Sequence, residues 1–585
     1  MRAVVDWSYG LLGEEEQAFL RSLGIFAGGF TVEAADAMLP GAARTRNSAL
    51  DHLAGLVTKS LVVVDVSGAQ PRFRLLDTTR AYAIDKLDSS GERERMARRH
   101  AEYYLTLFKR AESEVPARPT AEWIADYARE IDNLRAALDW VFSPGGDGSM
   151  GMALTAAAVP LWMRLSLLEE CRSRAKQALG ALGTGGTRDP REEMRLHAAL
   201  GTSTPEAAEL GEAFTKALDI AESLGDSEYQ LRALRGLCFY HTGRNRYRDA
   251  LPFAQKFHDL ATSGSDPSDQ LFGERMLGVA KHFVGDQISA RRHLEQVLTH
   301  YAPTDHRQDV IRFQIDLRLS ARVFLARVLW LQGFSDQAVR TAEMSIAEAQ
   351  ATGHAMSLCY ALSLAACPIA LWVGNLAAAA HYTGMLLDHS RRHSLPLWSA
   401  FGSRFQIVVD LKGGDIDTGF RLLHTATAES KLSFRFLTGL CELVEALGHV
   451  GRIAEGLALV EAGIAQSEGG WLTPEFLRLK AELLLLQSAR AVAQTAEDLF
   501  RQALDGARRQ ETLSWELRAA TSLARLLRNQ GRPVEAMAFL QPVYDRFTEG
   551  FDTADLLAGK ILLDELNSLT ASPIIADYRR RDLAA

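Results

Sequence analysis

The residues best suited to metal chemistry are two histidines, His389 and His393, spaced four positions apart. On a helix this spacing would place both imidazoles on one face, as a zinc site requires. No glutamate follows His389, as it would in the zincin motif, and no third ligand is evident beyond Asp388. The sequence also lacks H-E-x-x-H, G-x-S-x-G and EF-hand patterns. We therefore expect neither a metal site nor an enzyme.

Nucleotide binding would require a glycine-rich loop, G-x-x-x-x-G-K-[ST], whose backbone amides and lysine hold the phosphates. The nearest approach is residues 180–187, GALGTGGT, in which Gly186 replaces the lysine. This stretch follows a predicted helix rather than a strand, so we interpret it as a loop between helices. We expect no cofactor on this chain, and ATP or ADP only in a nucleotide-binding domain outside it.

The elements at residues 1–90 follow the order of a winged helix. Glu14, Glu15 and Glu16 suit the start of a first helix, and Thr31 can cap a second. Residues 48–58 carry apolar side chains at helical spacing and form the third. Residues 61–64 are a short apolar run typical of a strand, and residues 72–75 alternate like the returning strand of a β-hairpin.

Two arginines on this predicted hairpin, Arg72 and Arg74, are the candidate DNA contacts. A helix that enters the major groove usually exposes several basic or amide side chains, and the third helix has few. We therefore expect a structural winged helix that does not contact nucleic acid directly.

The composition is that of an ordinary globular protein, with 47% apolar and 24% charged residues among 585. A net charge of −8 argues against a chain that mainly coats nucleic acid. The five cysteines show no C-x-x-C spacing, which favours buried thiols in the reducing cytoplasm. Residues 355–380 lack charged side chains, but Pro368 and Gly374 interrupt them. We expect a buried helical hairpin there and no membrane span.

Residues 149–548 repeat at a spacing of about 40 residues, which predicts an α-solenoid of about ten tetratricopeptide-like helical hairpins. Because no hairpin can bury its own apolar face, successive hairpins must stack. The longer gap between Ala290 and Ala338 predicts an inserted loop at residues 301–308. The small or apolar residues that mark the start of each second helix are Cys171, Leu210, Ala250, Ala290, Ala338, Ala378, Gly419, Gly456, Ala496 and Ala536.

Stacked hairpins of this kind form a superhelix with a concave groove lined by the first helix of each hairpin. Aromatic anchors dominate many interfaces, but aromatic rings also fill the cores of hairpins. Both interpretations stay open for the candidate groove residues, which are Trp162, Tyr240, His241, Trp330 and Trp372.

Several segments resemble the bacterial STAND regulators, which are signal-transducing ATPases related to the NB-ARC proteins. The resemblance rests on residues 6–9 (DWSY), 26–31 (FAGGFT), 56–61 (LVTKSL) and 73–83 (FRLLDTTRAYA). The tail, residues 547–556 (FTEGFDTADL) and 563–566 (LDEL), is similar to the rhizobial-type predicted ATPases of this group. The resemblance implies a regulator with a DNA-binding domain, a nucleotide-binding switch, this winged helix and a tetratricopeptide-like sensor arm.

In the NB-ARC relatives, a Met-His-Asp motif contacts the bound nucleotide through its histidine. The matching positions here are Leu75, Leu76 and Asp77, so a leucine replaces the histidine. The resemblance implies that Asp77 and Arg80 face a nucleotide-binding domain, without direct phosphate sensing at position 76. The other interpretation is a surface pair at the start of a helix.

These patterns divide the chain into a winged helix (1–90), a helical coupling segment (91–148), the array (149–548) and a capping helix with a tail (549–585). We expect a non-enzymatic cytoplasmic signalling module, the sensor arm of a STAND-type transcriptional regulator without its nucleotide-binding domain. Its partners would be that domain and a protein or small effector in the groove, with no membrane; self-association is left open. A free-standing tetratricopeptide scaffold and a DNA-binding regulator are the alternatives.

Overall fold

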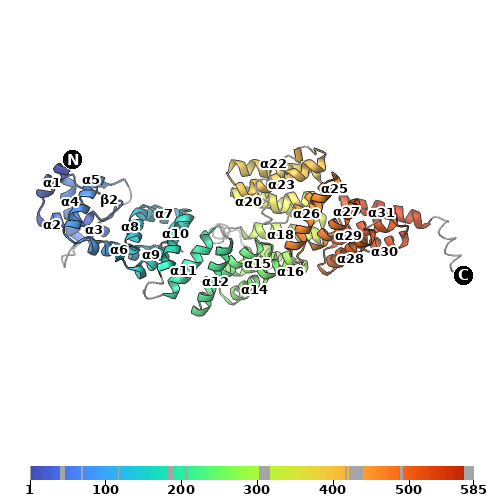
Figure 1. Ribbon diagram of the computed structural model, residues 1–585, viewed down its shortest axis with the longest axis horizontal. Coiled ribbons are helices and arrows are strands. Elements are labelled where there is room, and N and C mark those ends of the chain that lie inside the picture. Colours follow the sequence, from blue (N-terminus) through green and yellow to red (C-terminus); the bar gives the residue numbers. More distant parts are fainter. Residues whose placement is uncertain are drawn as a thin grey trace. The chain divides into compact units, whose positions relative to one another are not determined.

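Helices make up nearly all of the computed structural model (Figure 1). It describes residues 2–39, 46–67, 70–115, 117–181, 189–204, 207–301, 316–415, 418–419, 439–467, 469–487 and 492–571. The helices gather into two compact units, Met1–Gly236 and Leu237–Ala585, and the boundary between them falls within α13 (Ser227–Thr242). The prediction of a mainly α-helical chain, with a winged helix followed by helical repeats, is confirmed.

The winged helix has the predicted order of elements. Its helices are α1 (Arg2–Gly10), α2 (Glu14–Leu23), α3 (Val32–Ala37) and α4 (Arg46–Thr58). The strands β1 (Val63–Asp65) and β2 (Arg72–Arg74) pair antiparallel, and α5 (Asp77–Ser89) follows. Thr31 caps α3 by accepting a hydrogen bond of 3.2 Å from the Ala34 amide.

The core of the winged helix continues into the helices that follow it in the chain. Phe30 exchanges two backbone hydrogen bonds of 2.8 Å with Phe73 on β2, and its ring stacks on Phe26. These rings share one apolar core with Tyr104, Phe108 and other buried residues of the coupling segment. The coupling segment consists of α6 (Arg93–Glu114), α7 (Thr120–Tyr127), the 3₁₀ turn η1 (Ala128–Glu130) and α8 (Ile131–Val141).

The array consists of antiparallel helix pairs in both units. In the first unit these are α9 (Gly148–Arg164), α10 (Leu168–Gly180), α11 (Pro190–Ser203) and α12 (Ala207–Leu224). In the second unit, α13 is followed by α14 (Tyr247–Ser263), α15 (Pro267–Val284), α16 (Gln287–His300), α18 (Leu317–Leu331), α19 (Ser335–Thr352), α20 (Ala355–Ala361), the π-helical turn η4 (Leu362–Ala366), α21 (Cys367–Trp372), α22 (Leu376–Arg392), α23 (Pro396–Gly413), α25 (Leu440–His449), α26 (Ile453–Ser467), α27 (Thr473–Gln487), α28 (Ala493–Arg509), α29 (Leu513–Asn529), α30 (Pro533–Tyr544) and α31 (Ala554–Ala571).

The predicted markers fall on the second helices of these pairs. Ala250, Ala290 and Ala496 are each the fourth residue of their helix and are buried against its partner. Ala378 is displaced by one position, because α22 begins at Leu376 and it is Ala379 that is fully buried. Thr418 and Gly419 are described, but the residues after them, up to 438, lie outside the described residues.

Repeats that are far apart in the sequence meet inside the second unit. The Trp471 amide donates a hydrogen bond of 3.1 Å to the Phe283 carbonyl, and the Ala554 amide donates one of 3.2 Å to the Val373 carbonyl. The hydroxyl of Ser514 on α29 donates to the carbonyl of Trp330 on α18. The sequence predicts a concave groove lined by the first helix of each hairpin. At the three contacts above, these first helices or the residues next to them touch one another instead. Apolar side chains on their inner faces account for this closure.

The apolar stretch 355–372 is long and apolar enough to cross a membrane, yet 83% of it is buried among other helices. It forms α20, η4 and α21, as expected for a buried hairpin helix. Two other predicted features lie mostly outside the described residues: the inserted loop at 301–308, of which Tyr301 alone is described, and residues 182–187 of the glycine-rich stretch.

Candidate functional site

A buried ion pair joins the wing to the coupling segment. The guanidinium of Arg72 on β2 pairs with Glu130 of η1 and also donates to the Gly29 carbonyl at 2.6 Å. The second carboxylate oxygen of Glu130 accepts from the Tyr104 hydroxyl at 2.9 Å. Arg72 is therefore held inside the protein and is not available for the DNA contact that its sequence position suggests.

A second polar contact holds the loop between α2 and α3. The side-chain oxygen of Asn133 on α8 accepts from the Ala27 and Gly28 amides at 2.9 and 3.1 Å, and its nitrogen donates to the Gly29 carbonyl at 3.0 Å. Asn133 is fully buried, so these three bonds replace water around the loop backbone. The loop is fixed to α8 by its main chain.

His100 of α6 lies beside this loop, between the rings of Phe26 and Tyr104. Complete burial lowers the pKa of His100 to about 3, because a charged imidazole would lose its water there. The imidazole of His100 is therefore neutral at ordinary pH and packs between these two rings.

The described face of α4 offers little for a DNA groove. Its exposed side chains include Leu50, Asp51 and Ala54, and Lys59 just after the helix pairs with Glu16 at 2.6 Å. Arg74 on β2 is exposed. Of the two predicted DNA contacts, Arg74 lies at the surface, whereas Arg72 is paired with Glu130 inside the protein.

The two residues predicted to face a nucleotide-binding domain have different surroundings. Arg80 donates a hydrogen bond of 2.6 Å to the Phe26 carbonyl and is half-buried. Asp77 is exposed at the first position of α5, directly after Leu76, which is 44% exposed. Leu76, Asp77 and Thr78 are therefore exposed at the start of this helix, whereas Arg80 is not fully exposed.

Four tryptophans meet at the centre of the second unit. The Trp330 ring lies 4.7 Å from both the Trp372 and the Trp515 rings, and Trp372 lies 6.0 Å from Trp471. They come from α18, α21, α29 and the residues just before α27. Trp330 and Trp372, two of the predicted groove residues, are each 2% exposed. They lie in the closed centre of this unit rather than along a groove.

Arg327 of α18 is buried in this aromatic centre. Its guanidinium lies 4.7 Å from the Trp471 ring and within 6 Å of the Phe283, Phe324 and Trp372 rings. None of its three guanidinium nitrogens has a hydrogen-bond partner among the described residues. Burial lowers its pKa to about 10, because the buried guanidinium loses its water.

Arg518 of α29 lies nearby and is paired. It contacts Glu475 at 3.1 Å and Asp555 at 2.7 Å, and its guanidinium covers the rings of Trp330 and Trp515. Glu475, which is 1% exposed, also accepts two bonds from Arg478. These charges link α27, α29 and α31.

The remaining groove candidates differ in exposure. Trp162 on α9 is fully buried in the core of the first unit. Tyr240 and His241 at the end of α13 are half-buried, and the imidazole of His241 stacks on Phe253 at 5.3 Å. Burial lowers the pKa of His241. Only these two of the five candidates present part of their surface to solvent.

An open hollow of about 440 Å³ lies in the second unit between α16 and α29. Three arginines line it, Arg291, Arg292 and Arg546, together with two glutamates, Glu295 and Glu511, and apolar side chains that include Phe334 and Leu513. Arg291 lies over the Phe334 ring and pairs with Glu295, and Arg546 pairs with Glu516, whereas Arg292 is exposed. Most of the charge in the hollow is therefore paired, and Arg292 is the exposed cation beside its apolar surface.

The sequence did not identify the residues that hold the winged helix to the coupling segment, or the buried arginine of the second unit. Glu130 and Asn133 belong to a helical stretch without any motif, and their partners in the winged helix lie more than 50 residues earlier in the chain. Arg327 is an ordinary helix residue in sequence terms. Its position amid apolar residues, VFLARVLWL, was the one available signal that this charge is buried.

Comparisons with known proteins agree with these two parts of the chain. Residues 12–88 match the winged helix-turn-helix domain, and residues 319–344 and 517–542 match the tetratricopeptide repeat. The repeat matches fall on α18 with α19 and on α29 with α30.

Two curated relatives, from Mycobacterium bovis and Mycobacterium tuberculosis, carry the provisional name of an HTH-type transcriptional regulator. Each is 35% identical over 275 residues, which cover 46% of this chain and 30% of the relative. The match thus spans less than a third of these relatives.

A solved STAND protein with a tetratricopeptide repeat sensor, from Pyrococcus horikoshii, is 15% identical. The alignment covers 75% of this chain and 65% of that protein, with a TM-score of 0.39. A likeness of this extent carries no conclusion about activity. The chain contains a winged helix-turn-helix domain followed by tetratricopeptide-like helical repeats, an architecture consistent with a regulatory or protein-binding role.

Proposed function

We propose that this chain is the non-enzymatic sensor arm of a STAND-type transcriptional regulator in the cytoplasm. The helical array binds a protein or small effector, and α6 to α8 pass the resulting change to the winged helix. A separate nucleotide-binding domain, which holds ATP or ADP, receives that change.

The observation that carries this proposal is the attachment of the winged helix to the coupling segment. Arg72 and the loop at residues 27–29 are bound to Glu130 and Asn133, which lie on the elements that lead into the array. A winged helix held in this way must follow any displacement of α8. The names of the mycobacterial relatives support the assignment to transcriptional regulation.

The hollow lined by Arg291, Arg292 and Arg546 is the proposed binding site for the partner. Arg292 would pair with a carboxylate of the partner, and Phe334 and Leu513 would contact apolar side chains of the same segment. A substitution of Arg292 by glutamate would lower the affinity for such a partner, because the two negative charges would repel each other. The exposed side chain of Arg292 can be changed without loss of a buried contact.

The nucleotide-binding domain would contact the exposed start of α5. Leu76 and Asp77 are available there, whereas Arg80 is already bonded to Phe26. The test is the affinity of the full chain for the P-loop domain encoded upstream of it or in a neighbouring gene. We expect Asp77→Arg to weaken this binding and the control Asp51→Arg, on the exposed face of α4, to leave it unchanged. The proposal fails if no P-loop domain is encoded nearby, or if a purified one does not bind the chain.

A DNA-binding regulator is the second candidate, because residues 12–88 match a winged helix-turn-helix domain and Arg74 is exposed. Titration of duplex DNA at several salt concentrations separates the two. Binding with a steep salt dependence, lost in Arg74→Ala and strengthened in Asp51→Arg, would support the second candidate over the first.

A further inference from the structure

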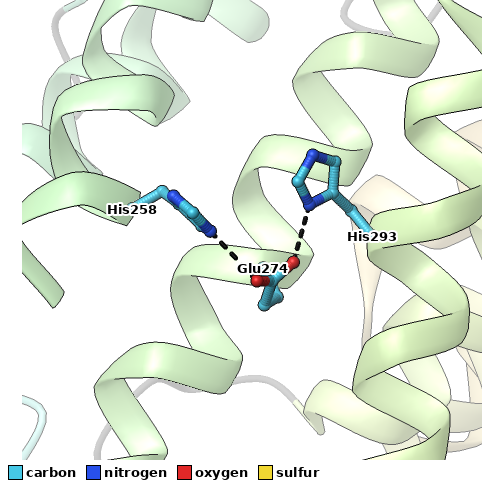
Figure 2. Close-up of side chains that lie close together, drawn as sticks. All are labelled: His258, Glu274 and His293. Atoms are coloured by element: carbon cyan, nitrogen blue, oxygen red, sulfur yellow. Dashed lines mark hydrogen bonds and ion pairs between the residues drawn. The ribbon is translucent and has the colours of Figure 1, made fainter. Parts of the chain in front are cut away.

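Two histidines and a glutamate from three helices converge in the second unit (Figure 2). His258 lies on α14, Glu274 on α15 and His293 on α16. The Nε2 atom of His258 lies 3.0 Å from one carboxylate oxygen of Glu274, and the Nδ1 atom of His293 lies 2.6 Å from the other. The two imidazoles approach the carboxylate from opposite sides.

We propose that His258, Glu274 and His293 bind one zinc ion or a similar divalent transition metal. Two imidazole nitrogens and one carboxylate are the ligand set of zinc sites that keep a fourth position for water. Ligands at 2.0–2.1 Å from a tetrahedral zinc lie about 3.3 Å from one another. The ligand atoms here already lie within 4.8 Å of one another, so small side-chain movements complete the site.

The surroundings of the three side chains suit such a site. His293 is buried, whereas His258 and Glu274 are half-buried, so an ion can enter from solvent. Gln296, one turn after His293 on α16, has an amide orientation in which its nitrogen lies 2.8 and 3.2 Å from the carboxylate oxygens of Glu274. An amide in this position orients the carboxylate, as outer-shell groups do in metal sites.

Metal binding requires a simple change of tautomer. When each imidazole donates to Glu274, one proton occupies His258 Nε2 and the other occupies His293 Nδ1. These same nitrogens must offer lone pairs to the metal, so each proton moves to the other nitrogen of its ring. Zinc is favoured over calcium or magnesium, which prefer ligand sets made of oxygen.

The ion would join neighbouring repeats. α14 is the second helix of one hairpin, and α15 and α16 form the next. A bond from each of these helices to one ion would fix the stacking of the two hairpins, on which the stability of such an array depends. The metal would then stabilise the folded array rather than catalyse a reaction.

The test is titration of the full, chelator-treated chain with Co²⁺, a spectroscopic substitute for Zn²⁺. We expect saturation at about one ion per chain, visible absorption of a four-coordinate ion without thiolate bands, and displacement by Zn²⁺. His258→Ala and Glu274→Gln should each weaken binding more than Gln296→Ala, which should cost about 10–100-fold as an outer-shell change. Zn²⁺ should raise the melting temperature of the wild type but not that of the ligand variants.

The matched control is His393→Ala. His389 and His393 also lie close together, with ring centroids 4.5 Å apart, but without a carboxylate bonded between them. We expect His393→Ala to bind Co²⁺ as the wild type does, and the helical circular dichroism of every variant without metal to match that of the wild type. The proposal is overturned if the wild type shows no saturable binding, if Glu274→Gln binds with unchanged affinity, or if His393→Ala abolishes binding.

Discussion

The interface of the winged helix and the centre of the second unit both bury arginines, but they satisfy them differently. Arg72 has Glu130 and the Gly29 carbonyl as acceptors. Arg327 has aromatic rings around it and no hydrogen-bond acceptor among the described residues. A buried charge without an acceptor costs free energy, whereas a paired one roughly offsets its own desolvation.

This difference means that the winged helix and the centre of the second unit are held in place in different ways. The winged helix is attached by bonds that would each be lost if it moved, so it follows α8. Around Arg327, the centre of the second unit is closed by apolar contact around a cation that burial disfavours. A ligand that supplied an acceptor to Arg327, or that opened this centre, would relieve that cost. The second unit is therefore the part of the chain better suited to change its packing.

The largest expected effect on stability comes from the ion pairs around Glu475 in the second unit. Glu475→Gln removes the carboxylate that Arg478 and Arg518 share and leaves two buried cations with fewer acceptors. We expect the free energy of unfolding to fall by about 3–5 kcal/mol. Urea unfolding followed by circular dichroism measures it. Glu482→Gln is the control, because Glu482 is more exposed and lies 3.8 Å from Arg478, and its loss should cost less than about 1 kcal/mol.

Arg327→Met should have a much smaller effect. Methionine fills a similar volume, and removal of the unpartnered charge should by itself raise the free energy of unfolding by about 1–4 kcal/mol. The loss of contacts with the four rings opposes this gain by about 2 kcal/mol, so the net change should lie between about −1 and +2 kcal/mol. The matched variant is Arg518→Met, which should be destabilising because it breaks bonds to Glu475 and Asp555. Equal destabilisation by both variants would remove the distinction between the two arginines.

A smaller effect on the free energy of unfolding is expected as the pH falls. His100 is neutral in the folded protein, with a pKa of about 3, whereas an exposed histidine has a pKa of about 6.5. Between these values the unfolded chain binds a proton that the folded chain does not. Stability contributed by neutral His100 is therefore complete above pH 6.5 and falls by about 1.4 kcal/mol per pH unit below it. His100→Phe should reduce this slope in urea unfolding at several pH values; an unchanged slope would mean that His100 is not buried neutral.

The repeats were predictable because their signal is local. Ala250, Ala290 and Ala496 must be small where two helices of a hairpin cross, and each hairpin repeats that demand. The wing was predictable because strand alternation and the turn lie within about 15 residues. The order of elements thus follows from short-range patterns.

The contacts of the site were not predictable, because they join residues far apart in the sequence. Arg72 and Glu130 are separated by 58 positions, and Ser514 and Trp330 by 184. Neither pair leaves a pattern in one sequence. The tryptophans at 330 and 372 were identified as important, but whether they line a groove or fill a centre depends on the curvature of the array, which spacing does not fix.

The most direct test of the account is native-state hydrogen exchange of the winged helix after a change in α8. Leu138→Ala removes a fully buried side chain from α8 and should cost about 2–5 kcal/mol there. If the winged helix follows α8, the Phe30 and Phe73 amides, which bond each other's carbonyls, lose protection together with the amides of α8. Loss of protection in α8 with unchanged exchange at Phe30 and Phe73 would contradict the transmission of a signal through this segment.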